Sequence, residues 1–94
     1  MSDIEVAVVQ QKSRDVIIVP LAPGFELRTP LEQNLTLNNV KDAARAASLE
    51  GDVIAIWQDR AGGRRYIAPA ELDGFCQLLT MRWVRRHLNK RIEL

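Results

Sequence analysis

The apolar residues in the first part of the chain are grouped into two short runs that predict strands. Residues 4–10, "IEVAVVQ", and residues 15–21, "DVIIVPL", are rich in β-branched side chains, which favour strands. The polar residues "QKSR" lie between them, so the pair predicts a hairpin or a meander. Pro20 has no N–H to donate to a neighbouring strand. The second strand is therefore expected to end at Pro20 or to lie at an edge of the sheet.

The next segment is broken by proline and predicts a loop. Residues 20–30, "PLAPGFELRTP", contain three prolines and a glycine. Thr29 and Glu32 have the spacing of a capping box, and Pro30 occupies the favoured first helical position. The polar residues of "NLTLNN" interrupt the apolar pattern that follows, so only a short turn of helix is expected there.

A longer helix is predicted for residues 38–51, "NNVKDAARAASLEG". An Asn residue can cap its start, and Gly51 is placed to cap its end. One face carries apolar residues, most of them small, which permit close approach to a sheet or to another helix. These residues are Val40, Ala43, Ala44 and Ala47.

The second half of the chain predicts a hairpin and a final helix. Residues 52–58, "DVIAIWQ", and residues 64–68, "RRYIA", are joined by a loop that contains glycine. Pro69 suits the first turn of a helix that would run to about residue 92, a length of about 35 Å. The resulting prediction is a single α+β domain, residues 1–94, with element order ββαββα. Its sheet is expected to be four-stranded and mostly antiparallel, with two helices on one face and the long helix C-terminal.

The predicted last helix has apolar residues on two opposite sides. Helical spacing of about 100° per residue gathers one set into a stripe that suits packing on a sheet. That set is Leu72, Phe75, Cys76, Leu79 and Trp83. A second set, on nearly the opposite side, is Met81, Val84, Leu88 and Ile92. One sheet cannot cover both sides, so a second surface must bury the second set.

Two alternatives remain open for the cover of Met81, Val84, Leu88 and Ile92. In one, the loop of residues 20–27 folds over the back of the helix within the same chain. In the other, these four residues form an association face that meets a second copy of the chain or a different protein, because exposed apolar stripes are uncommon on monomers. The second alternative predicts a non-enzymatic binding or assembly protein, a homodimer or an adaptor.

The net charge of +1 conceals an uneven distribution. Residues 1–59 carry a net charge of −4, and residues 60–94 carry +5. The cations of the second part are Arg60, Arg64, Arg65, Arg82, Arg85, Arg86, Lys90 and Arg91. This basic surface can lie beside an association seam, where long side chains cover apolar atoms, or pair with the acidic part of a neighbour.

Nucleic-acid binding is the alternative function that the basic residues suggest. Arginine suits phosphate oxygens, and Trp57, Tyr66 and Trp83 would stack on bases if they were exposed. The small net charge and the absence of a helix-turn-helix, RNP or GXXG pattern count against this alternative. Both tryptophans are predicted to lie in the core.

Catalysis is not predicted from this sequence. Cys76 and His87 lie eleven residues apart, about 16 Å along one helix, too far to share a proton. No spacing of residues resembles a metal or phosphate site, so neither a metal nor a cofactor is expected. A single cysteine allows no disulfide within the chain, which favours a cytoplasmic location. The apolar runs are too short to span a bilayer, and a membrane partner is not expected.

Overall fold

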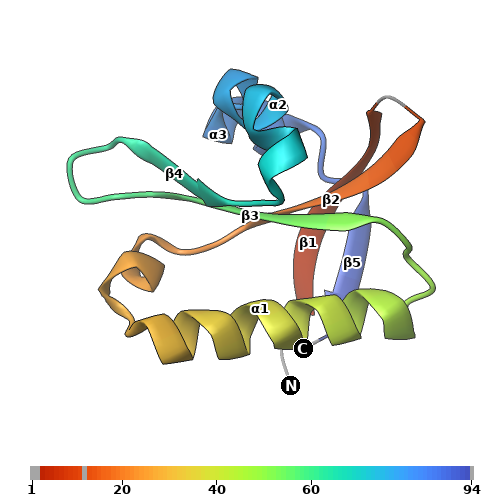
Figure 1. Ribbon diagram of the computed structural model, residues 1–94, viewed down its shortest axis with the longest axis horizontal. Coiled ribbons are helices and arrows are strands. Elements are labelled where there is room, and N and C mark those ends of the chain that lie inside the picture. Colours follow the sequence, from red (N-terminus) through yellow and green to blue (C-terminus); the bar gives the residue numbers. More distant parts are fainter. Residues whose placement is uncertain (1–2, 12, 94) are drawn as a thin grey trace.

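The protein is an α+β domain built around one five-stranded mixed sheet. The computed structural model describes residues 3–11 and 13–93. The strand order is β4-β3-β2-β1-β5 (Figure 1). The strands are β1 (Asp3–Gln11), β2 (Arg14–Pro20), β3 (Asp52–Gln58), β4 (Arg64–Ile67) and β5 (Lys90–Glu93). The helices are α1 (Pro30–Ala46), α2 (Asp73–Leu78) and α3 (Met81–Arg86), with 3₁₀ turns η1 (Pro23–Leu27) and η2 (Ala70–Leu72).

The prediction of a four-stranded sheet is wrong, because a fifth strand, β5, pairs with β1. In the described residues, three of the four strand pairings are antiparallel. The remaining pair, β2 and β3, is parallel, because α1 carries the chain back before β3 begins. β2 and β3 are covered on their two faces, and this explains their almost continuous apolar sequences. The hairpins β1–β2 and β3–β4 are antiparallel and lie on either side of this parallel pair.

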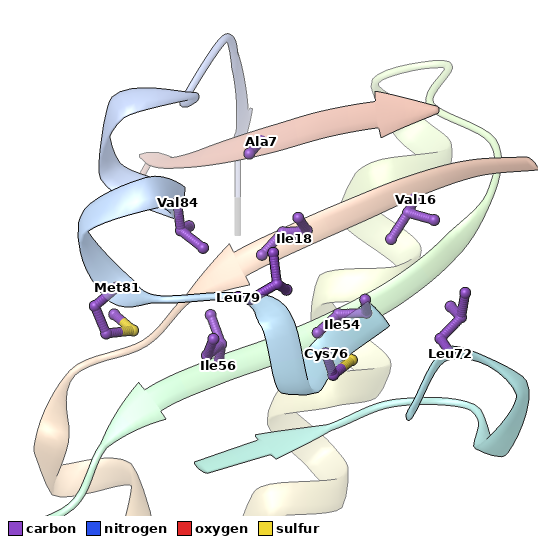
Figure 2. Packing of buried hydrophobic residues seen from close by; sticks show 10 residues of the cluster. All are labelled: Ala7, Val16, Ile18, Ile54, Ile56, Leu72, Cys76, Leu79, Met81 and Val84. Carbon is purple, nitrogen blue, oxygen red and sulfur yellow. The ribbon is translucent and has the colours of Figure 1, made fainter. Parts of the chain in front are cut away.

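The helices lie on both faces of the sheet, so the prediction of two helices on one face is also wrong. α1 covers one face, and α2 and α3 cover the opposite one (Figure 1). Figure 2 shows the core under α2 and α3, where Ile18 and Ile54 meet Cys76 and Leu79. The alternate residues Ile17 and Val53 point to the other face and pack against α1. This division follows from the two-residue period of a strand.

α1 begins earlier than predicted and runs unbroken through the polar segment "NLTLNN". The Thr29 hydroxyl accepts from the Glu32 N–H at 3.2 Å, and the Glu32 carboxylate accepts from the Thr29 N–H at 3.0 Å. This capping box starts a helix of 17 residues. The polar residues of this segment point mainly to solvent, whereas Leu37 and Val40 face the sheet.

The end of α1 is closed by Ser48, not by Gly51. Ser48 has a φ of 62°, and the Leu49 N–H donates to the Ala44 carbonyl at 2.9 Å. A bond from Ser48 N–H to the Arg45 carbonyl completes a Schellman motif. Gly51 instead lies directly before β3, where it passes close to the backbone of Asp15.

The prediction of a long C-terminal helix is wrong. Leu79 and Thr80 are extended, with ψ of 141° and 155°, and they separate α2 from α3. The Thr80 hydroxyl accepts from the Trp83 N–H at 3.1 Å and so caps α3. The break lets Leu79 enter the core, and it also lets the guanidinium of Arg64 donate to the carbonyl oxygens of Gln77 and Leu79.

The last residues form a strand because β1 offers an unpaired edge. Residues 90–93 run antiparallel to residues 3–6, with Val6 opposite Lys90 and Asp3 opposite Glu93. Ile92 thereby enters the core on the α1 side of the sheet. The gain in backbone hydrogen bonds and buried apolar surface outweighs the helix propensity of the segment.

Candidate association and basic surfaces

The four residues predicted to form an association face do not lie on one surface. Met81 and Val84 are 7% and 0% exposed and pack into the core above the sheet. Leu88 is half-buried beside the same core. Ile92 is 2% exposed and belongs to the core on the opposite face. The association role of these residues remains a prediction. The long helix from which it was inferred does not form, since the segment is divided into α2, α3 and β5.

The three arginines of the β3–β4 hairpin point in different directions. Arg64 faces α2 and donates to backbone carbonyls there. Arg65, its neighbour on β4, faces the other side and lies 3.4 Å from both Glu26 and Asp59. Arg60 is exposed in the turn. The hairpin therefore contributes one arginine to packing and one to ion pairs, and it does not present a continuous basic surface.

The remaining residues of the predicted basic surface lie on α3 and on β5. Arg82, Arg85 and Arg86 are exposed on α3, whereas Met81 and Val84 point inward. In the described residues, none of these three arginines has a carboxylate within 4.0 Å. We call these three residues the arginine group. Lys90 and Arg91 are exposed on β5, where Arg91 stands opposite Glu5.

Most of the aromatic side chains in the described residues contact other side chains of the domain. Trp57 is 5% exposed and makes an edge-to-face contact with Phe25, with ring centroids 4.8 Å apart. The hydroxyl of Tyr66 donates to the carboxylate of Asp73, and this hydrogen bond raises the pKa of Tyr66. Trp83 is half-buried and stacks on the exposed ring of His87 at 3.9 Å. Only the Trp83–His87 stack lies beside the arginine group.

An exposed leucine face on α1 is the feature that the sequence analysis missed. Leu31 and Leu35 are 70% and 54% exposed and lie one turn apart on α1. Leu31 points away from the sheet, nearly opposite the buried Val40. We call Leu31 and Leu35 the leucine face. Leu27, at the end of η1, is also exposed, at 64%, but it does not belong to the helix. The spacing of Leu31 and Leu35 is visible in the sequence, but the expected break of the helix after its first turn concealed their common face.

Cys76 and His87 make no hydrogen bond to each other in the described part of the chain. Cys76 is buried, and desolvation raises the pKa of its thiol, which keeps it protonated and unreactive. His87 is exposed, and its Nδ1 lies 2.7 Å from the Trp83 carbonyl oxygen. Within residues 3–11 and 13–93, no group of three His, Cys, Asp or Glu side chains is arranged to hold a metal ion.

Comparisons with known proteins found no relative for this chain. No family model, curated protein or solved structure matched it. In the described part of the chain, no helix has both the length and the apolar character needed to cross a bilayer.

Proposed function

We propose that the protein is a non-enzymatic binding or assembly protein that forms a homodimer through the leucine face of α1. The observation that carries this proposal is the exposure of two large apolar side chains one turn apart on the same side of α1, Leu31 and Leu35. Contiguous apolar surface of this kind marks association sites more often than scattered single residues do. The proposed association surface therefore lies on α1, and not on the C-terminal segment where the sequence analysis predicted it.

The spacing of the leucine face suits a symmetric contact. Leu31 and Leu35 lie four residues apart on α1. In an antiparallel pair of helices with a two-fold axis between these two positions, Leu31 of one protomer meets Leu35 of its partner. A two-fold interface requires this kind of self-complementary surface.

The energetics favour a reversible dimer. Full burial of one leucine side chain contributes about 1.5–3 kcal/mol. Four partly exposed leucines, two from each protomer, contribute an amount comparable to the lower part of the association cost of about 4–15 kcal/mol. We therefore expect a weak dimer that is populated only as the protein concentration rises.

Light scattering after size exclusion, over a range of concentrations, tests this proposal. We expect the wild-type mass to approach two chains as the concentration rises, and the Leu31→Glu variant to remain at one chain. Leu78→Glu is the matched control, because Leu78 is 81% exposed on α2, across the sheet from α1. A wild-type protein that keeps the mass of one chain at high micromolar concentration contradicts the proposal. So does equal dissociation by both variants.

Nucleic-acid binding through the arginine group is the second candidate function. It is supported by three outward arginines on α3 that lack a nearby carboxylate in the described residues. The Trp83–His87 stack beside them offers an aromatic surface. Arg64 and Arg65 are engaged elsewhere, so the proposed surface is smaller than the sequence predicted.

The salt dependence of binding distinguishes this candidate from dimerisation. Contact of three arginines with phosphates predicts a slope of log affinity against log salt of about −3 at most. Replacement of Arg85 and Arg86 by Gln should reduce that slope by about two. Absence of retention of single- or double-stranded oligonucleotides on a filter at low salt would remove the candidate.

The location of the protein belongs to the same proposal. We place it in the cytoplasm, and the support is that its only cysteine, Cys76, is buried as a free thiol. A fusion to a fluorescent protein, followed by cell fractionation, tests this location. Recovery of the fusion in a membrane or secreted fraction would contradict it.

A further inference from the structure

A cavity of about 500 Å³ lies beside the C-terminal half of α1, next to β3. This volume falls within the range of about 300–1,000 Å³ that is typical of small-ligand sites. Its apolar lining includes Leu37 and Leu49, and its charged lining consists of Lys41, Arg45, Glu50 and Asp52. The leucine face does not contribute to it, so this inference is independent of the proposed dimer.

The cavity lies beside the first residues of β3, which have no pairing partner in β4. The β3–β4 ladder ends at the pair Ala55 and Ile67. The same register would place Pro69 opposite Val53, but proline has no N–H to donate. The chain then leaves the sheet and enters η2 directly after Pro69. Val53 and Pro69 both line the cavity.

The peptide groups of Val53 point along the sheet toward this open edge. The Leu21 N–H donates to the Ile56 carbonyl at 2.8 Å, so Ile56 directs its peptide groups toward β2. Successive residues of a strand direct these groups to alternate sides. Val53, three positions before Ile56, therefore faces the side of β4. In the described residues, no backbone hydrogen bond joins Val53 to residues 68–69.

The cations at the cavity are only partly neutralised. Lys41 and Arg45 lie one turn apart on α1 and both line the cavity. Arg45 has an exposed and therefore weak contact with Asp42 at 3.7 Å. Asp52, which also lines the cavity, is held by Arg14 at 2.6 Å. Glu50, the second carboxylate of the lining, makes no ion pair within 4.0 Å among the described residues. Among the described residues, Lys41 has no carboxylate within 4.0 Å.

We propose that this cavity binds a small molecule that carries a carboxylate, an amide and an apolar body, such as an N-acylated apolar amino acid. The carboxylate lies against Lys41 and Arg45, and the amide pairs with the peptide groups of Val53. The apolar body covers Leu37 and Leu49. A peptide with an apolar C-terminal residue presents the same chemistry, and the experiment separates the two sources.

Titrations of the isotope-labelled protein, followed by amide chemical shifts in NMR spectra, test this inference. The probes are N-acetyl-leucine, its uncharged analogue N-acetyl-leucinamide, and a tripeptide that ends in leucine. We expect saturable shifts of Val53, Leu49 and Lys41 with N-acetyl-leucine. The amide analogue should bind roughly tenfold more weakly, because it lacks the charge-assisted hydrogen bonds. Tighter binding of the tripeptide would identify a peptide end as the natural source, whereas equal or weaker binding would identify a small molecule.

Variants connect the binding to the cavity. Lys41→Gln should weaken N-acetyl-leucine roughly tenfold and leave N-acetyl-leucinamide unchanged. Arg85→Gln, a control on α3 across the sheet, should change neither. The spectrum of each variant without ligand shows whether its fold is intact. The inference is overturned if millimolar N-acetyl-leucine produces no saturable shifts, if the shifts map outside the cavity, or if both probes bind equally.

Discussion

The side-chain amide of Asn89 pairs with both backbone groups of Val8. Its oxygen accepts from the Val8 N–H at 2.9 Å, and its nitrogen donates to the Val8 carbonyl at 3.0 Å. The Asn89 backbone N–H also donates to the Val6 carbonyl at 3.0 Å. Asn89, directly before the first residue of β5, thus extends the pairing of β1 by one step. It closes an edge that would otherwise expose unpaired peptide groups.

Replacement of Asn89 by Ala should lower the free energy of unfolding by about 1–2 kcal/mol, because two hydrogen bonds to the backbone are lost. Urea denaturation followed by circular dichroism measures the change. Asn38→Ala is a suitable control, since Asn38 is exposed on α1 and makes no side-chain hydrogen bond among the described residues. Equal midpoints for Asn89→Ala and the wild type would show that the pairing adds nothing to stability.

Arg64 joins the β3–β4 hairpin to the link between α2 and α3. Its guanidinium donates to the carbonyl oxygens of Gln77 and Leu79. The Arg64→Met variant should lose about 1–3 kcal/mol of stability, since it leaves these oxygens without a charged donor. Arg60→Met, in the exposed turn of the same hairpin, should change stability by no more than about 0.5 kcal/mol. Thermal unfolding of both variants provides the comparison, and similar losses in the two would argue against this role.

Gly51 is required by its surroundings as well as by its backbone conformation. Its φ is 138°, and a Cβ there would lie 2.2 Å from the carbonyl oxygen of Asp15. Gly51→Ala should therefore destabilise the fold by at least about 2 kcal/mol. Gly24→Ala is the matched control, because a Cβ at Gly24 would meet no atom within 4 Å. If denaturant midpoints shift equally for both, the close approach to Asp15 is not the cause.

The capping box of α1 predicts a pH dependence of stability. The hydrogen bond from the Thr29 N–H is the largest cause that lowers the pKa of Glu32 from its ordinary value of 4.5. A carboxylate with a lowered folded-state pKa contributes stability above its unfolded pKa, and this contribution is lost as the pH falls through the folded value. The Glu32→Gln variant should be less stable than the wild type at neutral pH, with a difference that shrinks below about pH 4.5.

Urea melts at several pH values measure the contribution of Glu32. Glu50→Gln is the control, since Glu50 makes no hydrogen bond among the described residues. A difference between wild type and Glu32→Gln that stays constant from neutral to acidic pH would contradict the assignment.

Local signals in the sequence predicted the elements, but not how they combine. The β-branched runs predicted β1 to β3, and the glycine-containing loop predicted the β3–β4 hairpin. These predictions were possible because a hairpin is formed by strands that are adjacent in the sequence and joined by a short loop. The capping box at Thr29 marked the start of α1 correctly. The length of α1 was underestimated, because exposed polar and leucine residues obscured the stripe formed by Leu37 and Val40.

The C-terminal segment could not be predicted from helical periodicity. The apolar spacing of residues 72–92 fits one helix, yet the cap at Thr80 and the unpaired edge of β1 divide it into two helices and a strand. Only the tertiary partner, residues 3–6 of β1, selects a strand for residues 90–93. The two apolar sides assigned to one helix belong instead to cores on both faces of the sheet, as Val84 and Ile92 show.

The pairing of β1 with β5 also has a consequence for biosynthesis. Residues 3–6 are made early, but their partners at residues 90–93 leave the ribosome only near the end of the domain. Until then the nascent chain holds an open, apolar strand edge around Ile4 and Val6, which is a surface prone to mispairing with other chains. A domain closed in this way is expected to complete its folding only after residues 90–93 have been made, and to depend on chaperones until then.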